Sequence, residues 1–384
     1  MSYLGEATQT YTNGDGSILR SYTGKNDETF GSVCAFAQAQ GYLLYSEHEQ
    51  DGSRFATYCR GDELLHVYWM ADTARLCTVM SDTAAGALPE PVAEGGDGTA
   101  TVTQLCLPLT QNNSYANGMG YVVRLSDGSF LIWDGGYAEQ AGQLWNTLVS
   151  QNGGEQGILI RAWVITHAHG DHYGCIKAFS EQYAGRVTVE RFLIAPVNPA
   201  DAAASFLHTT FPGIAAKFAG AKICQLHTGM RFAYAGLTLE VLLAPDELYI
   251  NGGIADFNNS SVITRLYDGQ DSILFLGDAM QEATNRLTSV YGDTLKVNQV
   301  QVAHHGVGNS SAAFYQSLEP STLWYPCGER LYDWTEAFAD NIRRNGAVRQ
   351  ELHESGLYEI LLHDTTAWLR VWGSRSPAQA FDVS

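Results

Sequence analysis

Residues 166–174 read Thr-His-Ala-His-Gly-Asp-His-Tyr-Gly and place three histidines and one aspartate within six consecutive positions. The run before them, 161–165, is mostly apolar with β-branched residues and predicts a buried strand. The run after them, 175–179, predicts the first turns of a helix. The polar residues are therefore expected in a strand-to-helix loop, where catalytic groups are commonly displayed on a rigid scaffold.

Imidazole and carboxylate side chains are good ligands for zinc and also for manganese and iron. His167 and His169 are two residues apart in an extended segment and can point to the same side of the chain. Asp171 and His172 follow one turn of loop later and can face a second, neighbouring position. A surface loop that is rich in histidine by chance is the alternative. The density of ligand types and the strand before them favour a metal site.

The acidic composition restricts the partners of the chain. Only 22 lysines and arginines stand against 41 acidic residues, and the formal net charge is −19. Because binding to a phosphate backbone draws most of its affinity from Lys and Arg, a long nucleic acid is disfavoured as partner. The balance favours a protein that acts on a small or neutral substrate.

The length of 384 residues allows one large domain or two ordinary ones. No apolar run approaches the ~20 residues that span a bilayer, and residues 1–16 lack the pattern of a secretory signal. The seven cysteines are dispersed without a Cys-x-x-Cys pair, which predicts buried free thiols and a cytoplasmic location. Cys175, beside the histidine-rich loop, is expected to pack inside a helix rather than to bind zinc.

Residues 1–95 predict a small α+β module whose role the sequence does not indicate. Apolar residues at helical spacing predict a helix over 27–41. Short alternating runs separated by turn signals predict three or four antiparallel strands, over 42–46, 54–60, 64–70 and 75–80. A segment rich in Ala, Gly and Pro at 82–98 predicts a linker, so a second domain is expected over 96–384.

Two groups in the N-terminal module carry ligand-type side chains. Glu47, His48 and Glu49 could form a ligand cluster, but an exposed polar strand end is the preferred interpretation. His66 lies in an apolar run and is expected to be a hydrogen-bonded core or edge residue.

Residues 96–384 predict alternating strands and helices in two runs. In the first run a strand over 130–133 is followed by Asp134-Gly-Gly, and a strand over 158–165 leads into the histidine-rich loop. In the second run a strand over 272–276 ends in Gly277-Asp278, and a strand over 297–302 ends in Ala303-His304-His305-Gly306. Helices are expected over 140–151, 202–218, 281–291 and 336–345, strands also over 101–109, 120–125 and 262–267, and an Asn-Asn-Ser-Ser segment lies at 258–261.

These motifs, in this order, resemble those of the metallo-β-lactamase superfamily over roughly residues 101–372. The resemblance implies an α/β fold, a four-layer αββα sandwich with the metal between the edges of two sheets. The combination is most similar to the branch that contains the hydrolase domain of competence DNA-uptake channel proteins and related stand-alone hydrolases.

The resemblance also implies roles for single residues. Asp278 would bridge two metals. Asp134 would lie behind the histidine-rich loop, where its carboxylate would fix the orientation of a histidine. Asn258 or Asn259 could lie nearby as a neutral oxygen donor, a weaker ligand type, and Asn259 is the one expected behind the ligands. The implied metal ligands are His167, His169, Asp171, His172, Asp278 and His305.

Two departures from the family pattern leave the number of metals open. Many members have another histidine between the histidine-rich loop and Gly-Asp; the candidates here are His208 and His227, in stretches that predict a helix and a strand end. A later His-Pro of the family falls on 333–335, Asp-Trp-Thr, which has no histidine. Either fewer protein ligands hold the second metal or His304 or His305 serves instead. We expect one or two ions, zinc or alternatively manganese or iron.

The implied activity is that of a metal-dependent hydrolase that attacks its substrate with a metal-bound hydroxide. Asp171 could orient the water, His304 or His305 could protonate the leaving group, and Ser310 and Ser311 could bind an anion or simply fill a polar loop. A small phosphodiester is the favoured substrate, with a lactone, thioester or amide as the alternative. A third hypothesis is a catalytically inactive metal-binding or scaffolding protein.

Overall fold

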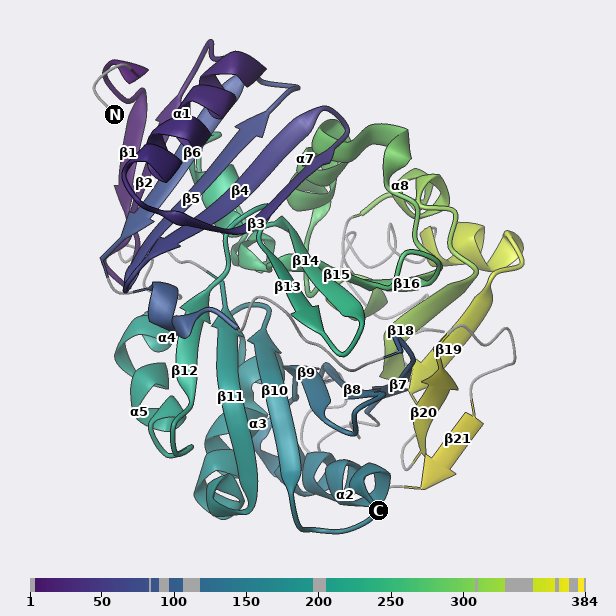
Figure 1. The fold of residues 1–384 in the computed structure, drawn as a ribbon. Helices are drawn as coiled ribbons and strands as arrows, with labels where there is room; N and C mark the ends of the chain where they lie inside the picture. The colour runs from purple at the N-terminus through teal and green to yellow at the C-terminus, as the bar shows by residue number, and fades with distance from the viewer. Residues whose placement is uncertain are drawn as a thin grey trace.

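The structure is a computed structural model that describes residues 4–82, 84–89, 97–105, 118–195, 205–307, 310–328, 348–362, 366–372 and 379–382. These residues form three sheets with helices between and around them (Figure 1). The helix expected over 336–345 and the Asp-Trp-Thr segment at 333–335 lie outside the described residues. No helix of the described part is long and apolar enough to cross a membrane.

The N-terminal sheet has six strands in the order β1-β2-β6-β5-β4-β3, all antiparallel to their neighbours, with one helix on its outer face. Its elements are β1 (Gln9–Thr12), β2 (Ile18–Tyr22), α1 (Asp27–Ala39), β3 (Leu43–Gln50), β4 (Ser53–Arg60), β5 (Glu63–Met70) and β6 (Arg75–Ser81).

The second sheet has eight strands in the order β12-β11-β10-β9-β8-β7-β20-β21. Its strands are β7 (Ala100–Gln104), β8 (Gly120–Leu125), β9 (Phe130–Asp134), β10 (Ile158–Ile165), β11 (Val187–Ile194), β12 (Lys222–Gln225), β20 (Thr366–Val371) and β21 (Gln379–Asp382). Four helices accompany it: α2 (Ala141–Asn152), α3 (Gly170–Gln182), α4 (Ser205–Thr209) and α5 (Phe211–Ala215).

The third sheet has seven strands in the order β13-β14-β15-β16-β17-β18-β19. Its strands are β13 (Arg231–Tyr234), β14 (Leu237–Leu243), β15 (Ile263–Tyr267), β16 (Ser272–Phe275), β17 (Gln299–Gln301), β18 (Thr322–Gly328) and β19 (Tyr358–Leu362). Its helices are α6 (Pro245–Tyr249), α7 (Gln281–Tyr291) and α8 (Ala312–Ser317).

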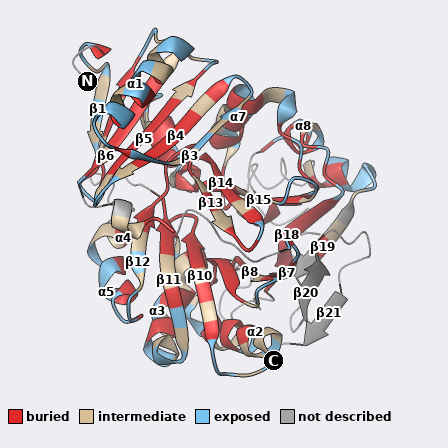
Figure 2. Cartoon of the chain, in the orientation of Figure 1, coloured by how far each residue is buried: buried red, intermediate tan, exposed pale blue. Residues whose placement is uncertain are grey.

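The second and third sheets stack face to face and confirm the expected αββα sandwich. Side chains from both fill one buried core, where the rings of Trp133 and Phe275 stack with centroids 4.1 Å apart. A second core lies between the second sheet and α2, α3 and α5, and a third lies between the third sheet and α7 and α8. Because both faces of the central strands are covered, these strands are buried along nearly their whole length (Figure 2).

The N-terminal sheet packs against the sandwich rather than standing apart. Phe55 and Tyr68 from its inner face belong to the same buried cluster as Leu287 of α7. Polar contacts add to this packing: Arg75 donates to Asn251 Oδ1 at 2.6 Å, and Arg286 pairs with Asp72. The buried His66 ring bonds Thr57 Oγ1 and the Thr228 carbonyl, each at 2.9 Å, which confirms it as a hydrogen-bonded core residue.

Several sequence predictions for this region were wrong in detail. The sheet contains β1 and β2, which were not predicted: β1 is a short polar strand at the sheet edge, and β2 is a run of only five residues between β1 and β6. β3 extends to Gln50, and the side chain of His48 is only 6% exposed because it lies 3.2 Å from Glu240 of β14. The polar strand end is therefore part of the contact with the sandwich.

Other differences concern element boundaries in the sandwich. The helical stretch expected over 202–218 contains two short helices, α4 and α5. Pro212 lies in the first turn of α5, a position that favours the start of a new helix. The strand expected over 101–109 is described only as β7, Ala100–Gln104. Cys175 is fully buried in the helix-side core, as expected, and burial raises the pKa of its thiol.

Candidate metal centre

The histidine-rich loop, residues 166–172, is called the metal loop below, and it lies where β9 and β10 end. These two strands run parallel, so Asp134 at the end of one lies beside Thr166 at the end of the other. The Asp134 carboxylate is fully buried and accepts hydrogen bonds from the Thr166 backbone N–H, the Thr166 hydroxyl and His172 Nδ1, each at 2.8 Å. These bonds hold the loop and turn His172 Nε2 away from Asp134.

The loop itself delivers its ligands from a strand end and a helix start. His167 is buried directly after β10, and His169 precedes the first residue of α3. Asp171 and His172 lie in the first turn of α3. His167 Nε2 and His169 Nδ1 are 2.9 Å apart, so the two rings converge on one position.

Asp278 reaches the same place from the opposite sheet. It follows β16 and Gly277, whose backbone has φ = +56°. A Cβ atom at Gly277 would lie 2.9 Å from Ser261 Oγ and 3.0 Å from Thr166 Cβ, so only glycine allows the two loops to approach this closely. Ser261 Oγ accepts from the Asp278 N–H at 3.0 Å, and the Val262 N–H donates to the Thr166 carbonyl at 3.0 Å. The edges of the two sheets are thereby joined.

His304 and His305 lie in a tight turn that follows β17 and borders the metal centre. Both have positive φ, 49° and 54°, a backbone region that non-glycine residues occupy only when their surroundings hold them there. His305 Nδ1 donates to the Pro326 carbonyl at 2.9 Å, so its Nε2 faces inward, 3.3 Å from Asp171 Oδ2 and 3.7 Å from Asp278 Oδ1. The side chain of His304 is 27% exposed, with Nε2 3.9 Å from Asp278 Oδ2.

The side chains form two groups of possible metal ligands that share one residue. His167, His169 and Asp278 make the first group; Asp171, His172, Asp278 and His305 make the second. Within each group the ligand atoms lie within 4.8 Å of one another. Asp278 belongs to both groups, so its carboxylate could serve as a ligand in either one.

Several atoms that face the centre make no protein hydrogen bond, although carboxylate oxygens lie near two of them: His172 Nε2 is 3.1 Å from Asp278 Oδ2, and His305 Nε2 is 3.3 Å from Asp171 Oδ2. His172 Nε2, Asp278 Oδ1 and His305 Nε2 are buried and make no hydrogen bond with any described residue. Buried polar atoms are rarely left unsatisfied, and nitrogen and carboxylate oxygen are the donors that zinc and related divalent metals accept. The residues therefore fit a divalent metal.

The pKa values of the ligand histidines shift in different directions. Burial lowers the pKa of His167 well below its usual value, which keeps the imidazole in the neutral form that a metal requires. Burial lowers the pKa of His172, but the charges of Asp278 and Asp134 outweigh it and raise the pKa well above its usual value. For His305, burial is likewise outweighed by Asp278 and Asp171, which raise the pKa of the ring. A metal would therefore displace protons from these two rings as it binds.

Burial raises the pKa of Asp278, but the positive charges of His172 and His305 outweigh it and hold the pKa well below its usual range. The central carboxylate is therefore ionised at neutral pH.

Other residues singled out in the sequence have different roles. Asn259 Oδ1 accepts from the N–H groups of Met280 and Ala283, at 2.9 and 3.2 Å, and so holds the start of α7 just after Asp278. His227 pairs with Asp246 at 2.8 Å, and His208 lies against Gly14. Neither histidine belongs to the two ligand groups found among the described residues.

The two serines after His305 serve local structure. Ser310 Oγ contacts the Ala279 carbonyl and Thr284 Oγ1, at 3.4 Å each. Ser311 Oγ accepts from the Phe314 N–H at 3.2 Å and caps α8. Of the two interpretations of these serines, polar filling of a loop is the one the contacts support.

Two aromatic residues beside the ligands were not identified from the sequence. Phe257 is half-buried, and the centroid of its ring lies 5.1 Å from that of His169 and 6.3 Å from that of His167. Burial, and next the charge of Asp171, raise the pKa of Tyr137 to about 12. Phe257 directly precedes the Asn-Asn-Ser-Ser segment and Tyr137 directly follows Asp134-Gly-Gly, so proximity to a motif was the signal that could have found them.

The comparisons with known proteins agree with this geometry. A sequence model described as the metallo-beta-lactamase superfamily matches residues 117–319, more than half of the chain, and the chain therefore belongs to this superfamily. Among curated proteins, none matches the chain.

Solved structures of the same fold resemble it at low identity. The metallo-beta-lactamase fold protein YhfI from Bacillus subtilis is 14% identical, with 71% of this chain and 100% of that chain covered and a TM-score of 0.44. CmlA, a diiron beta-hydroxylase from Streptomyces venezuelae, is 15% identical, with 73% and 55% covered and a TM-score of 0.42. Zn(2+)-bound PqqB from Methylobacterium extorquens is 11% identical, with 68% and 97% covered and a TM-score of 0.43. These likenesses assign neither a metal nor a reaction to this chain.

Proposed function

We propose that this protein is a metal-dependent hydrolase whose centre holds one or two divalent ions, most simply zinc. The observation that carries the proposal is the pair of ligand groups that meet at Asp278, with inward-facing nitrogen and oxygen atoms that make no protein hydrogen bond. Metals bound there would lower the pKa of a water molecule toward ~7 and polarise the bond under attack.

The surrounding side chains would bind the metal, donate a proton and orient water. His305 has Nδ1 engaged with the Pro326 carbonyl, which assigns its Nε2 to the ligand set. His304 is partly exposed and is left to donate a proton to the leaving group. Asp171 contacts His305 while its side chain is 23% exposed, so it can bind a metal and orient the attacking water. Thr166 and Asp134 keep His172 in place.

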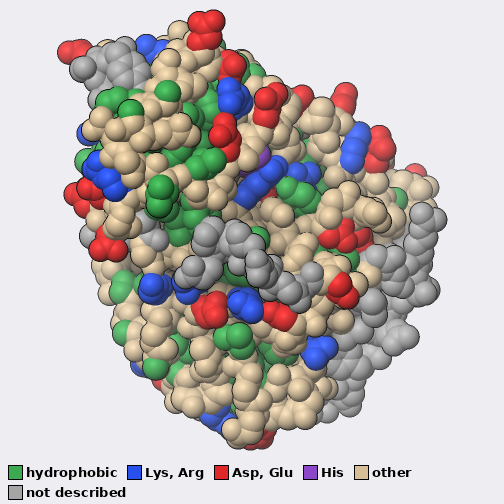
Figure 3. Space-filling model, viewed as in Figure 1, with side chains coloured by type: hydrophobic (Ala, Val, Ile, Leu, Met, Phe, Trp, Pro, Cys, Tyr) green, Lys and Arg blue, Asp and Glu red, His purple; other side chains and the backbone are tan. Residues whose placement is uncertain are grey.

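A small phosphodiester is the substrate that we propose. Two adjacent ligand groups suit a phosphoryl group, because two metals about 3.5–4 Å apart clamp the attacking and leaving oxygens. The net charge of −19, with acidic and basic side chains interspersed on the face in Figure 3, is unfavourable for a long polyanion. The resemblance of the motifs is our reason for proposing the branch of competence-type and stand-alone hydrolases, and the dispersed cysteines are our reason for proposing a cytoplasmic location.

Metal analysis and substrate hydrolysis test the proposal together. Purified protein should contain zinc, manganese or iron and should cleave bis(p-nitrophenyl) phosphate, with activity lost in His169→Ala and Asp278→Asn. Metal-loaded protein that is inactive on phosphodiesters but active on a lactone or thioester would overturn the substrate. Protein that takes up no divalent metal, and a folded Asp278→Asn variant with unchanged melting temperature, would favour the scaffolding alternative instead.

A further inference from the structure

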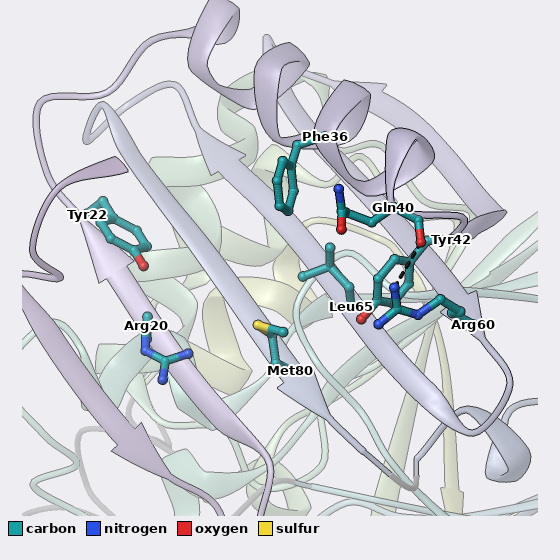
Figure 4. Close-up of a pocket in the computed structure, with 8 residues that line it drawn as sticks. All are labelled: Arg20, Tyr22, Phe36, Gln40, Tyr42, Arg60, Leu65 and Met80. Carbon is teal, nitrogen blue, oxygen red and sulfur yellow. Dashed lines mark hydrogen bonds between the residues drawn. The ribbon is translucent and has the colours of Figure 1, made fainter. Parts of the chain in front are cut away.

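The N-terminal module contains a cavity that the metal chemistry does not use. It has a volume of about 430 Å³ and lies between the end of α1 and the outer face of the six-stranded sheet (Figure 4). Its lining comes from α1, β2, β4, β5, β6 and the segment between α1 and β3: Arg20, Tyr22, Phe36, Gln40, Tyr42, Arg60, Leu65 and Met80. This volume lies within the usual range of small-molecule sites.

The cavity exists because one helix cannot cover this sheet. A helix with side chains is about 10 Å wide, whereas six strands extend over about 24 Å. The buried side of α1, with Phe30, Val33 and Ala37, packs with Tyr58 of β4 and Val67 of β5 in one cluster. Toward β2, beyond the helix, Leu4 and Ala7 join the same cluster as Tyr22, and the cover of the outer face is incomplete. The cavity is thus a consequence of the topology rather than of a local packing defect.

The charge of the lining is opposite to that of the whole protein. It contains two arginines and no carboxylate, in a chain with a net charge of −19. Arg60 is already engaged: it pairs with Glu63 at 2.6 Å, donates to the Gln40 carbonyl at 2.8 Å and lies over the Tyr42 ring. The hydrogen bond from Arg60 also satisfies the Gln40 carbonyl at the end of α1. An unsatisfied carbonyl there would repel an anion.

Arg20 differs from Arg60 because it has no ion-pair or hydrogen-bond partner among the described residues, where the other lining arginine has several. Tyr22, two residues along β2, projects from the same face of the strand, and both side chains line the cavity. A guanidinium beside a phenol hydroxyl is a donor set for a carboxylate or phosphate oxygen. Met80 of β6 and Leu65 of β5, with Phe36 of α1, form the apolar middle of the cavity. Gln40, Tyr42 and Arg60 lie at its other end (Figure 4).

We propose that this cavity binds a small organic anion, in which an oxyanion group is carried on a flat apolar body. The oxyanion would be held by Arg20 and Tyr22, and the apolar body would lie against Phe36, Leu65 and Met80. The inner face of the same sheet packs against the sandwich through Phe55 and Tyr68. The anion site is therefore separate from the metal centre and does not depend on the proposed hydrolase activity.

Calorimetric titration of the full-length, metal-loaded protein tests this site. The probes are 2-naphthoate, 2-naphthylmethylphosphonate and the neutral 2-naphthalenemethanol, which share one ring system and differ in the polar group. We expect at least one anion to bind about tenfold or more tightly than the alcohol. The tighter of the two anions identifies the ligand as a carboxylate or a phosphate.

Three variants complete the test. Arg20→Gln should remove the preference for the anion, and Met80→Trp, which fills the cavity, should abolish binding of all three probes. Arg54→Gln is the matched control, because Arg54 lies on the same sheet but not in the lining; it should bind as the unmodified protein does. Binding that survives both Arg20→Gln and Met80→Trp, as it would at the metal centre, overturns the proposal, as does absence of binding by both anions.

Discussion

At the scale of the residue, hydrogen bonds decide which ring nitrogen of a histidine faces the metal centre. His172 Nδ1 is bound to Asp134, and His305 Nδ1 is bound to the Pro326 carbonyl. Both rings therefore present Nε2, and a carbonyl or carboxylate behind each ring fixes its tautomer. The ligands are oriented before any metal binds.

Asp134→Asn tests this orientation directly. The amide cannot accept from Thr166 and His172 as the carboxylate does, so His172 loses its fixed tautomer. We expect zinc affinity to fall by about 10- to 100-fold with little change in fold, measured by competition with a chromophoric chelator. Asp127→Asn, which removes a carboxylate paired with Arg161 at 2.7 Å in the same sheet, is the control. An affinity equal to that of the unmodified protein would contradict the assigned role of Asp134.

At the scale of the element, α7 is tied to the metal centre through its first turn. Asn259 Oδ1 accepts from two N–H groups there, and its Nδ2 donates to Glu282 Oε2 at 2.9 Å. Asp278 lies two residues before Met280, so the segment that starts the helix also places the shared ligand. Asn259 of the Asn-Asn-Ser-Ser motif thus helps to hold the segment that carries Asp278.

Asn259→Ala should lower both stability and metal affinity. Loss of the cap and its hydrogen bonds should cost about 1–3 kcal/mol in the free energy of unfolding, and a displaced Asp278 should weaken metal binding. Urea unfolding and metal titration measure the two effects. Asn258→Ala provides the comparison, because Asn258 Oδ1 has no hydrogen-bond partner among the described residues. If the two variants behave alike, the capping role of Asn259 is wrong.

The contact between β3 and β14 contains a buried carboxylate that makes stability depend on pH. Burial raises the pKa of Glu240, but the hydrogen bond with His48 and the charges of Arg265 and Arg231 lower it to about 2. A carboxyl whose pKa falls on folding stabilises the protein above its unfolded pKa, near 4.5, and this stabilisation is lost as the pH falls toward 2.

Glu240→Gln should therefore destabilise the protein most at neutral pH, by about 3 kcal/mol. The difference from the unmodified protein should shrink as the pH is lowered from about 5 toward the folded pKa near 2. Urea unfolding at a series of pH values gives the two curves. A difference that stays constant over this range would show that Glu240 is not the group that titrates.

At the scale of the whole molecule, the N-terminal sheet and the sandwich share one core. Leu19, Phe55, Tyr68, Met70 and Val79 are buried in the cluster that also holds α7 and the third sheet. A division at residues 1–95 and 96–384 remains our proposal for the two domains, and the shared core implies that they are not independent. Figure 1 shows the N-terminal sheet lying along one side of the sandwich.

A chain limited to residues 96–384 should therefore fail to fold stably. Re-exposing several apolar side chains at about 1.5–3 kcal/mol each amounts to about 10 kcal/mol, which equals the whole stability of an ordinary domain. Soluble yield and thermal melting of the truncated and full-length chains provide the measurement. A truncated chain that is soluble and melts at the same temperature would refute the shared core.

The sequence alone indicated the ligand types, because they are carried by motifs of adjacent residues. Through the resemblance of these motifs to a known family it also indicated the superfamily and the αββα sandwich. His167, His169, Asp171 and His172 are neighbours in the chain, so their chemistry is visible without a fold. Even His66 was predictable, since one polar residue in a buried strand must find partners.

The tertiary structure decided what depends on residues that are distant in the chain. It turned His48 inward onto Glu240, assigned Asn259 to the start of α7, and brought the aromatic residue Phe257 beside His169. It also left Arg20 without a described partner in an open cavity. Local sequence patterns cannot specify such contacts, because each depends on elements that are separate in the chain and meet only in the fold.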